Sequence, residues 1–126
     1  MTEKDYYEAA QKSMTSGNFM SASEHLESLE SHYPVGRYTE QAQLELIYSK
    51  FRHSDHAGAA TAADRFIRLH PSHAQIDYAL YLKGVINFND ELGLLSFLSR
   101  QDLSERDHRA AQADQHGVFY AVVQSQ

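Results

Sequence analysis

The sequence of 126 residues contains no cysteine, no tryptophan and only two prolines. Without cysteine, the chain has no disulfide framework, no thiolate zinc site and no cysteine nucleophile. Its longest uncharged apolar run covers residues 118–123, far short of the about 20 residues that a membrane-spanning helix needs. The hydrophobic content of 42% predicts a single globular domain built around one core.

Basic residues are also scarce, because 11 lysines and arginines stand against 17 aspartates and glutamates, a net charge of -6. An acidic chain without a basic cluster does not attract nucleic-acid phosphates, so we expect no nucleic-acid partner. Residues 1–4 lack the apolar segment of a signal peptide, which indicates a cytoplasmic protein or a chain whose leader has been removed. No nucleophile elbow or glycine-rich phosphate loop occurs, so we expect neither an enzyme nor a bound cofactor.

Alanine, glutamate, glutamine, leucine and serine dominate and strand-like alternation is absent, so we predict an all-α fold. Apolar residues at helical spacing, punctuated by Gly17, Pro34 and Pro71, indicate where the helices end. The predicted helices cover residues 3–16, 19–32, 39–52, 56–69 and 75–89. Residues 90–107 are predicted as a loop with a short helical turn, followed by a last helix at 108–116.

An offset of 37 residues superimposes Pro34 on Pro71 and Ala22 on Ala59. Small residues let paired helices approach closely, and the proline ends the second helix so that the next pair can stack. The spacing of Ala10, Ala22 and Pro34 matches the tetratricopeptide pattern. We therefore predict one domain, 1–126, that forms a tetratricopeptide solenoid of about two and a half repeats. The repeats cover about 3–36, 40–73 and 77–116, the last with an insertion at about 90–107.

Several motifs, in order along about residues 5–112, resemble a single family. They are GNF at 17–19, YPVGRY at 33–38, QAQLELIY at 41–48, AADRFIRLHPSH at 62–73 and the acidic loop at 102–107. The family is BamD (ComL), the tetratricopeptide lipoproteins of the bacterial outer-membrane β-barrel assembly machinery. The resemblance implies a scaffold at the periplasmic face of the outer membrane. Its partners would be sister lipoproteins of the BamC type and unfolded barrel proteins, which it would hold by their aromatic-ending terminal signal.

The chain departs from this family in several places. It lacks the lipid-bearing cysteine, so as written it carries no lipid anchor. Val35, Arg37 and His70 stand where an aromatic residue, a proline and an asparagine are usual. The chain ends before the repeats that include the family's main contact to BamA, so the resemblance leaves that contact open. We interpret the sequence as the N-terminal part of such a scaffold.

The first helix of each tetratricopeptide repeat lines a concave face where peptides dock. In this chain that face combines aromatic side chains and amides with Arg52, which can pair with a terminal carboxylate. The alternative is that Tyr48, Phe51 and Tyr81 simply pack in the core. The predicted peptide-binding groove comprises Tyr7, Gln11, Met14, Gln41, Tyr48, Phe51, Arg52, Tyr78, Tyr81, Phe88 and Asn89.

A second set of charged residues forms a predicted docking surface for partner lipoproteins. Asp64, Arg65 and Arg68 share one helix, where the alternative is a local ion pair between Asp64 and Arg68. The remaining docking residues belong to the acidic loop, where the alternative is a solvated loop whose last aspartate caps a helix. These loop residues are Asp102, Arg106 and Asp107.

Two histidine pairs, His53 with His56 and His70 with His73, have a spacing that metal ligands also use. Both pairs lie at predicted turns, so we favour ordinary turn residues and predict no metal site. The apolar segment 118–123 has high β-propensity, and we expect it to aggregate if exposed, to cap the last repeat or to exchange between chains.

The sequence therefore predicts a non-enzymatic binding scaffold of the outer-membrane assembly machinery. One alternative is a cytoplasmic tetratricopeptide adaptor for another peptide, such as an acidic C-terminal tail. That adaptor ranks second because the predicted groove offers mainly Arg52 as a basic clamp residue. The third possibility is a purely structural fragment with no ligand of its own.

Overall fold

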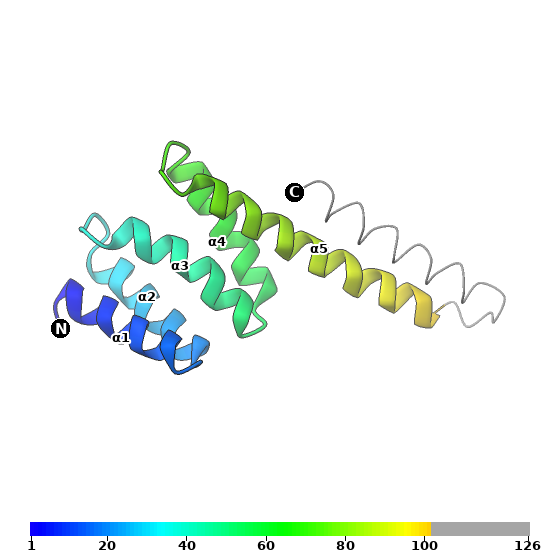
Figure 1. Cartoon of the computed structure of the whole chain (residues 1–126), viewed down its shortest axis with the longest axis horizontal. Coiled ribbons are helices and arrows are strands. Elements are labelled where there is room, and N and C mark those ends of the chain that lie inside the picture. The colour runs from blue at the N-terminus through cyan, green and yellow to red at the C-terminus, as the bar shows by residue number, and fades with distance from the viewer. Residues whose placement is uncertain (102–126) are drawn as a thin grey trace. The chain divides into compact units, whose positions relative to one another are not determined.

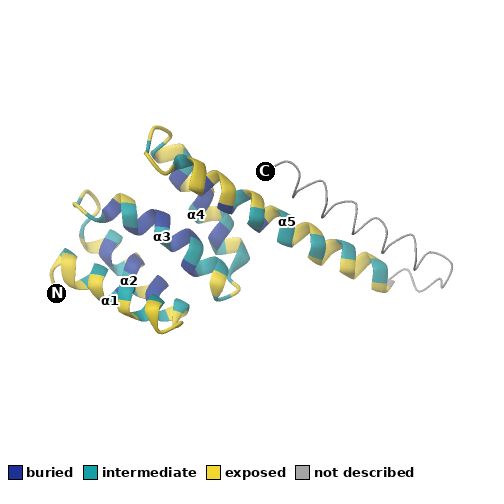
Figure 2. Ribbon diagram, in the orientation of Figure 1, coloured by how far each residue is buried: buried dark blue, intermediate teal, exposed yellow. Residues whose placement is uncertain are grey.

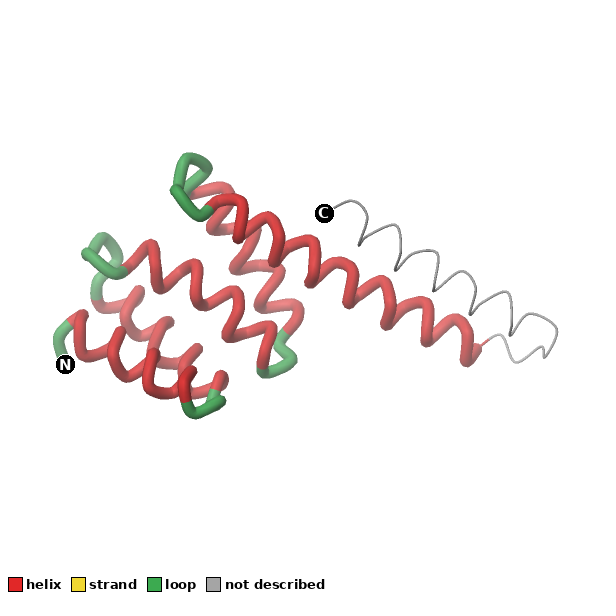
Figure 3. The backbone as a smooth tube through the Cα atoms, in the orientation of Figure 1, coloured by secondary structure: helices red, strands yellow, loops and turns green. Residues whose placement is uncertain are grey.

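The computed structural model describes residues 1–101, which form five α-helices joined by short turns (Figure 1 and Figure 3). These residues contain no strand, which confirms the predicted all-α fold for this part of the chain. The chain divides into two compact units, Met1–Ile86 and Asn87–Gln126. None of the described helices is long and apolar enough to cross a membrane. The helices are α1 (Glu3–Thr15), α2 (Phe19–His32), α3 (Thr39–Arg52), α4 (His56–Leu69) and α5 (Ile76–Gln101).

The turns within the two helical pairs repeat at the predicted offset of 37 residues. Gly17 and Ser54 both adopt a left-handed backbone, with φ of 78° and 69°. The residues that follow, Asn18 and Asp55, each accept a hydrogen bond from the backbone N–H three positions later, at 3.1 and 3.0 Å. Such caps satisfy amide groups that a helix leaves unpaired at its start. The same local chemistry therefore fixes where α2 and α4 begin.

The starts of α1 and α3 both involve residues near the N-terminus. Thr2 and Asp5 form the reciprocal capping box of α1. Glu3 accepts a hydrogen bond from the backbone N–H of Tyr38, at 2.5 Å, just before α3. Its carboxylate passes so close to Gly36 that a β-carbon at that position would collide with it. A side chain at position 36 would therefore require the Glu3 carboxylate to move away from this turn.

The core of residues 1–86 is organised around α3, which contributes to two buried clusters (Figure 2). The predicted small residues Ala10, Ala22 and Ala59 are fully buried, so the paired helices approach closely at these points. The first cluster comprises Ala10, Leu26, Leu29, Ala42 and Leu46. The second comprises Leu44, Ile47, Ala59, Ala63, Phe66, Ala79, Leu82 and Ile86.

The last described helix corrects one prediction. The helix predicted at 75–89 continues to Gln101, so the loop predicted from residue 90 is wrong as far as residue 101. Gly93 weakens this helix by about 1 kcal/mol relative to alanine but does not end it. Leu92 and Leu95 lie half-buried one turn apart and continue the helical pattern. The rest of the predicted loop, the helix at 108–116 and the segment 118–123 lie outside the described residues, and the division into repeats stays a prediction.

Candidate functional site

A partly buried carboxylate lies between α1 and α3. Gln11 donates a hydrogen bond from Nε2 to Oε1 of Glu45 at 2.7 Å. Burial, together with the hydrogen bond to Glu45 and the charge of that carboxylate, raises the pKa of Tyr7. The ring of Tyr7 also stacks on Tyr38, with 4.8 Å between centroids. The first and third helices thus present an aromatic surface with a negative charge in it.

An arginine supported by two aromatic rings lies at the end of α3. The guanidinium carbon of Arg52 lies 4.5 Å from the ring centroid of Phe19 and 5.4 Å from that of Tyr48. The same group donates a hydrogen bond to the Tyr48 hydroxyl. The two rings meet edge to face at 5.7 Å. Cation–π contacts and this hydrogen bond hold Arg52 in place while the residue remains exposed.

Two tyrosines at the start of α5 extend this surface. Tyr78 and Tyr81 are 39% and 52% exposed. Burial raises the pKa of Tyr78, and Tyr48 and Glu45 contribute to the shift because they lie nearby. We call this surface the aromatic face. Its members are Tyr7, Gln11, Phe19, Glu45, Tyr48, Arg52 and Tyr78.

The structure brings together only some of the residues predicted for the groove. Met14 and Gln41 are half-buried on α1 and α3. Phe51 stacks on His56 at 5.2 Å and packs against the second buried cluster, in line with the core alternative. Tyr48 packs against the same cluster, while its hydroxyl accepts a hydrogen bond from Arg52. Phe88 and Asn89 belong to the second compact unit, where both are half-buried. The aromatic face therefore retains Tyr7, Gln11, Tyr48, Arg52 and Tyr78 from the prediction, with Tyr81 next to Tyr78.

Two members of the aromatic face were missed in the sequence. Glu45 follows Gln41 by four residues and precedes Tyr48 by three, a spacing that places all three on one side of a helix. Extending the predicted stripe by helical spacing would have found this residue. Phe19 gave no comparable signal, since it starts α2 and reaches Tyr48 only through tertiary packing.

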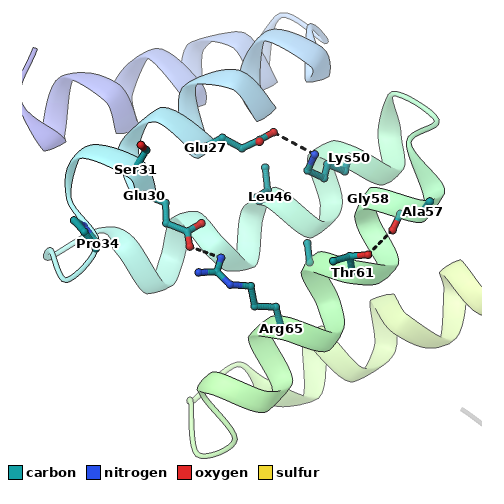
Figure 4. Close-up of a pocket in the computed structure, with 11 residues that line it drawn as sticks. Glu27, Glu30, Ser31, Pro34, Leu46, Lys50, Ala57, Gly58, Thr61 and Arg65 are labelled. Atoms are coloured by element: carbon teal, nitrogen blue, oxygen red, sulfur yellow. Dashed lines mark hydrogen bonds and ion pairs between the residues drawn. The ribbon is translucent and has the colours of Figure 1, made fainter.

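A cavity of about 740 Å³ opens between α2, α3 and α4 (Figure 4). Its walls combine small residues of α4 with charged residues of α2 and α3, and Leu46 contributes apolar surface. The Glu27 Oε1 atom lies 3.1 Å from Lys50 Nζ, which is also 3.4 Å from Asp55 Oδ2. Glu30 forms an ion pair with Arg65 (Figure 4). The lining residues are Glu27, Glu30, Ser31, Pro34, Leu46, Lys50, Ala57, Gly58, Thr61, Ala62 and Arg65.

These contacts shift the pKa values of Lys50 and Asp55 at the edge of the cavity. Burial opposes the charge of Lys50, but the bonds and charges of Glu27 and Asp55 outweigh it and raise the pKa of Lys50. The backbone N–H of Gly58, followed by Lys50, lowers the pKa of Asp55. The raised pKa of Lys50 and the lowered pKa of Asp55 both favour the charged forms of this ion pair near neutral pH.

The cavity and the aromatic face use different sides of α3. Each residue of an α-helix advances about 100° around the axis. Glu45, Tyr48 and Arg52 therefore fall within about 60° of one another, whereas Leu46 and Lys50 lie roughly 100–140° from Glu45. One helix thus supports two separate surfaces.

Only part of the predicted docking surface lies in the described residues. Arg65 lines the cavity. Asp64 forms an ion pair with Lys83, at 2.8 Å, instead of the local pair with Arg68 that was the alternative. The remaining docking residues, Asp102, Arg106 and Asp107, lie outside the described part of the chain.

The second histidine pair surrounds a glutamate. His70 Nδ1 and His73 Nε2 lie 3.3 and 3.8 Å from the Glu40 carboxylate, and His70 Nε2 lies 2.6 Å from Gln43 Oε1. Both histidine rings pack on Phe66, at 5.2 Å each. Within residues 1–101, no group of three or more histidine, aspartate or glutamate side chains is arranged to hold a metal ion. The contacts in this turn are those of a packed helix connection.

Comparisons with known proteins agree with the sequence motifs. A sequence model of the tetratricopeptide repeat family matches residues 1–124. The outer membrane protein assembly factor BamD of Neisseria meningitidis serogroup B is 39% identical over 94% of this chain and 44% of its own length. The BamD proteins of Vibrio cholerae and Xylella fastidiosa are 36% and 38% identical over 85% and 89% of this chain.

The matched regions cover 44% and 38% of the Vibrio and Xylella proteins, so this chain spans less than half the length of these relatives. The predicted resemblance to BamD is confirmed by these identities. Together with the five-helix architecture and its repeated turns, the match over residues 1–124 shows that the chain belongs to the tetratricopeptide-repeat family.

Proposed function

We propose that this chain is a non-enzymatic scaffold of the outer-membrane protein assembly machinery, working at the periplasmic face of that membrane. Its relatives bear the name of outer membrane protein assembly factors. Tetratricopeptide arrays bind peptides through side chains on paired helices, without chemistry of their own. In this proposal the aromatic face binds the C-terminal segment of an unfolded barrel protein.

The observation that supports this proposal is the state of Arg52. Its guanidinium is exposed and held on two aromatic rings, yet no carboxylate of residues 1–101 lies within ion-pair distance. A guanidinium offers five N–H donors, which match the two oxygens of a terminal carboxylate. The rings beside it offer stacking surface for an aromatic residue at the end of a peptide.

A fluorescence titration tests this proposal. The chain has no tryptophan, so a peptide from the end of an outer-membrane barrel protein can carry one as a clean reporter. We expect the peptide to bind, and to bind at least about tenfold more weakly without its terminal aromatic residue, since such a ring contributes on the order of 1–3 kcal/mol when buried.

Variants locate the binding surface. Tyr48→Ala combined with Arg52→Ala removes the arginine and one ring, and we expect it to abolish most of the affinity. Arg65→Ala removes a cation from the cavity side and serves as the matched control. The proposal fails if the double variant is folded by circular dichroism and still binds the peptide as tightly as the unmodified chain.

We propose the cavity between α2, α3 and α4 as the docking place of a second partner, a sister lipoprotein of the BamC type. The observation that favours it is the combination of apolar surface at Leu46 and Ala62 with a rim of charges. Charged groups around an interface mainly determine which partner binds and contribute less to how tightly it binds. Binding of the lipoprotein measured by calorimetry should weaken with Ala62→Arg, which fills the cavity, and stay unchanged with Tyr48→Ala.

The competing function is a tetratricopeptide adaptor for an acidic C-terminal tail. The aromatic face combines the exposed Arg52 with the carboxylate of Glu45, which would repel the charges of an acidic tail, so such a tail fits this face poorly. Tighter binding of an acidic tail peptide than of a barrel-protein peptide in the same titration would favour the adaptor.

A further inference from the structure

The two ion pairs at the cavity each bury one charge and expose the other. In the first pair, the side chain of Glu27 is 53% exposed, whereas that of Lys50 is only 18% exposed. In the second pair, the cation is the exposed member, because Arg65 is half-exposed and Glu30 is mostly buried. A molecule that approaches the cavity therefore meets a negative charge on α2 and a positive charge on α4.

Further contacts within the chain hold the two buried charges in place. Lys50 Nζ lies 3.4 Å from Asp55 Oδ2, in addition to its contact with the α2 carboxylate. Glu30 Oε1 accepts a hydrogen bond from Gln43 Nε2 at 3.1 Å. A buried charge without polar contacts is costly. Each buried charge here keeps a polar contact of its own when the exposed member of its pair also contacts a partner.

Both exposed charges have the capacity for a second contact. The ion pair with Lys50 uses Oε1 of Glu27, which leaves Oε2 for another donor. A guanidinium has five N–H donors, so Arg65 can bind an incoming carboxylate while it stays paired with Glu30. A partner can therefore add contacts to these ion pairs without breaking them.

The space beside these charges is apolar and large enough for a side chain. The cavity has a volume of about 740 Å³, and Leu46 lies between the two ion pairs (Figure 4). Ala62 and Gly58 carry little or no side chain and leave room on the α4 side. The lining includes two carboxylates and two cations, so it does not favour a partner of one charge sign. The arrangement of the two signs is what a partner has to match.

Given the proposed docking of a partner in this cavity, on which this step rests, we infer that the cavity binds an amphipathic helix whose contacting face carries an apolar side chain between one basic and one acidic residue. The basic residue pairs with Glu27 and the acidic residue with Arg65, while the apolar side chain packs on Leu46 and Ala62. Positions i, i+4 and i+7 of a helix lie on one face and can present these three groups. A wholly acidic or wholly basic face would place a like charge against one of the two exposed residues.

The test uses three synthetic helical peptides with a central tryptophan at i+4. Positions i and i+7 carry lysine and glutamate in the mixed peptide, two glutamates in the acidic peptide and two lysines in the basic peptide. Compensating charges on the opposite face give all three the same net charge. The chain has no tryptophan, so the emission of the peptide reports its burial.

Each peptide is titrated against the unmodified chain and against Glu27→Gln and Arg65→Gln, which each remove one exposed charge. The matched controls are Glu24→Gln and Arg68→Gln, because both residues are exposed on the same two helices and lie outside the cavity lining. On the unmodified chain and on the controls, the mixed peptide should bind about three- to fivefold more tightly than either other peptide.

The two variants should change this preference in opposite ways. On Glu27→Gln the mixed and acidic peptides should bind about equally, with the advantage over the basic peptide retained. On Arg65→Gln the mixed and basic peptides should bind about equally, with the advantage over the acidic peptide retained. Because the peptides are compared on the same variant, a loss of stability alone does not produce this pattern.

Equal binding of the three peptides to the unmodified chain would overturn the inference, as would preferences that stay the same in both variants. A mixed peptide that does not bind, or that still binds Ala62→Arg, would overturn it too. These outcomes are distinct from failure of the proposed docking. If Ala62→Arg weakens binding of the lipoprotein but the peptides bind equally, only the charge preference fails, whereas if the lipoprotein binds Ala62→Arg normally, the proposed docking of that partner fails.

Discussion

The two surfaces of residues 1–86 use their charges differently, although both depend on α3. Around the cavity, Glu27 and Lys50 form an ion pair across two helices, and Glu30 does the same with Arg65. On the aromatic face, Glu45 and Arg52 have no oppositely charged partner among residues 1–101. Charges that are paired within the chain hold helices together, whereas charges left unpaired on a rigid support are available to a ligand. We therefore propose the aromatic face as the place where the peptide binds, whereas the ion pairs around the cavity connect α2, α3 and α4.

The largest expected effect comes from a change that removes the support of both surfaces. Ile47 is fully buried on α3 in the second cluster. Ile47→Ala should lower the free energy of unfolding by about 3 kcal/mol, because it removes buried methyl groups and leaves a void. Urea unfolding followed by circular dichroism measures this loss. As a control, Val35→Ala changes a side chain that is 98% exposed, and its free energy of unfolding should stay within about 0.5 kcal/mol of that of the unmodified chain. A loss below about 1 kcal/mol for Ile47→Ala would contradict the shared role of α3.

The comparison predicts opposite outcomes for two single arginine variants. Arg52→Ala should weaken binding of the barrel-protein peptide about tenfold, equal to roughly 1.4 kcal/mol, with little change in stability. Arg65→Ala should leave that affinity unchanged and lower stability by about 0.5 kcal/mol, because a half-exposed ion pair contributes little. Fluorescence titration and thermal unfolding separate the two effects. Loss of peptide binding with Arg65→Ala alone would reverse the assignment of the two surfaces.

Much of this fold could be predicted from the sequence because its signals are local. Gly17, Asn18 and Asp55 act within one turn, so the starts of α2 and α4 were predicted to the residue. The end of α5 was not, since Gly93 is a weak breaker and the Leu92–Leu95 pattern outweighs it. The candidate site was harder to predict because it depends on contacts between helices rather than on local signals. The contact between Phe19 and Arg52 joins different helices, and the cavity depends on how α2 and α4 are spaced, which no local motif determines.

A smaller effect is the pH dependence of the stability that Asp55 contributes near the cavity. Asp55 caps α4 and pairs with Lys50, and its pKa is lowered in the folded chain. A lowered folded pKa stabilises the protein above the unfolded value near 3.9, and this stabilisation is lost as the pH falls through the folded pKa. Asp55→Ala should thus cost about 1 kcal/mol at pH 7 and less at pH 3.

The matched cap in the first helical pair is an amide, which provides the control. Asn18→Ala should also cost about 1 kcal/mol, with no such decline between pH 7 and pH 3, because an amide does not titrate there. Urea unfolding of both variants at the two pH values measures the difference. A cost for Asp55→Ala that is the same at both pH values would argue against the ionised cap.

The smallest expected effect concerns a residue on neither surface. Ser54 is exposed and has a φ of 69°, where Gly17 stands in the first pair. Ser54→Gly relieves this strain, but glycine also loses more entropy on folding, so the net gain should be about 0.5 kcal/mol. Peptide affinity should not change. A change in peptide affinity with this variant would indicate that binding follows overall stability. Affinity changes in the other variants would then not identify the binding surface.

The most direct test is to observe where the peptide binds. An NMR titration of a sample labelled at tyrosine rings and alanine methyl groups reports on both surfaces at once. The account predicts that a barrel-protein peptide shifts the ring signals of Tyr7, Tyr48 and Tyr78 and leaves the methyl signals of Ala57 and Ala62 in place. Shifts confined to Ala57 and Ala62, with the three tyrosine signals unchanged, would place the peptide in the cavity and contradict the account.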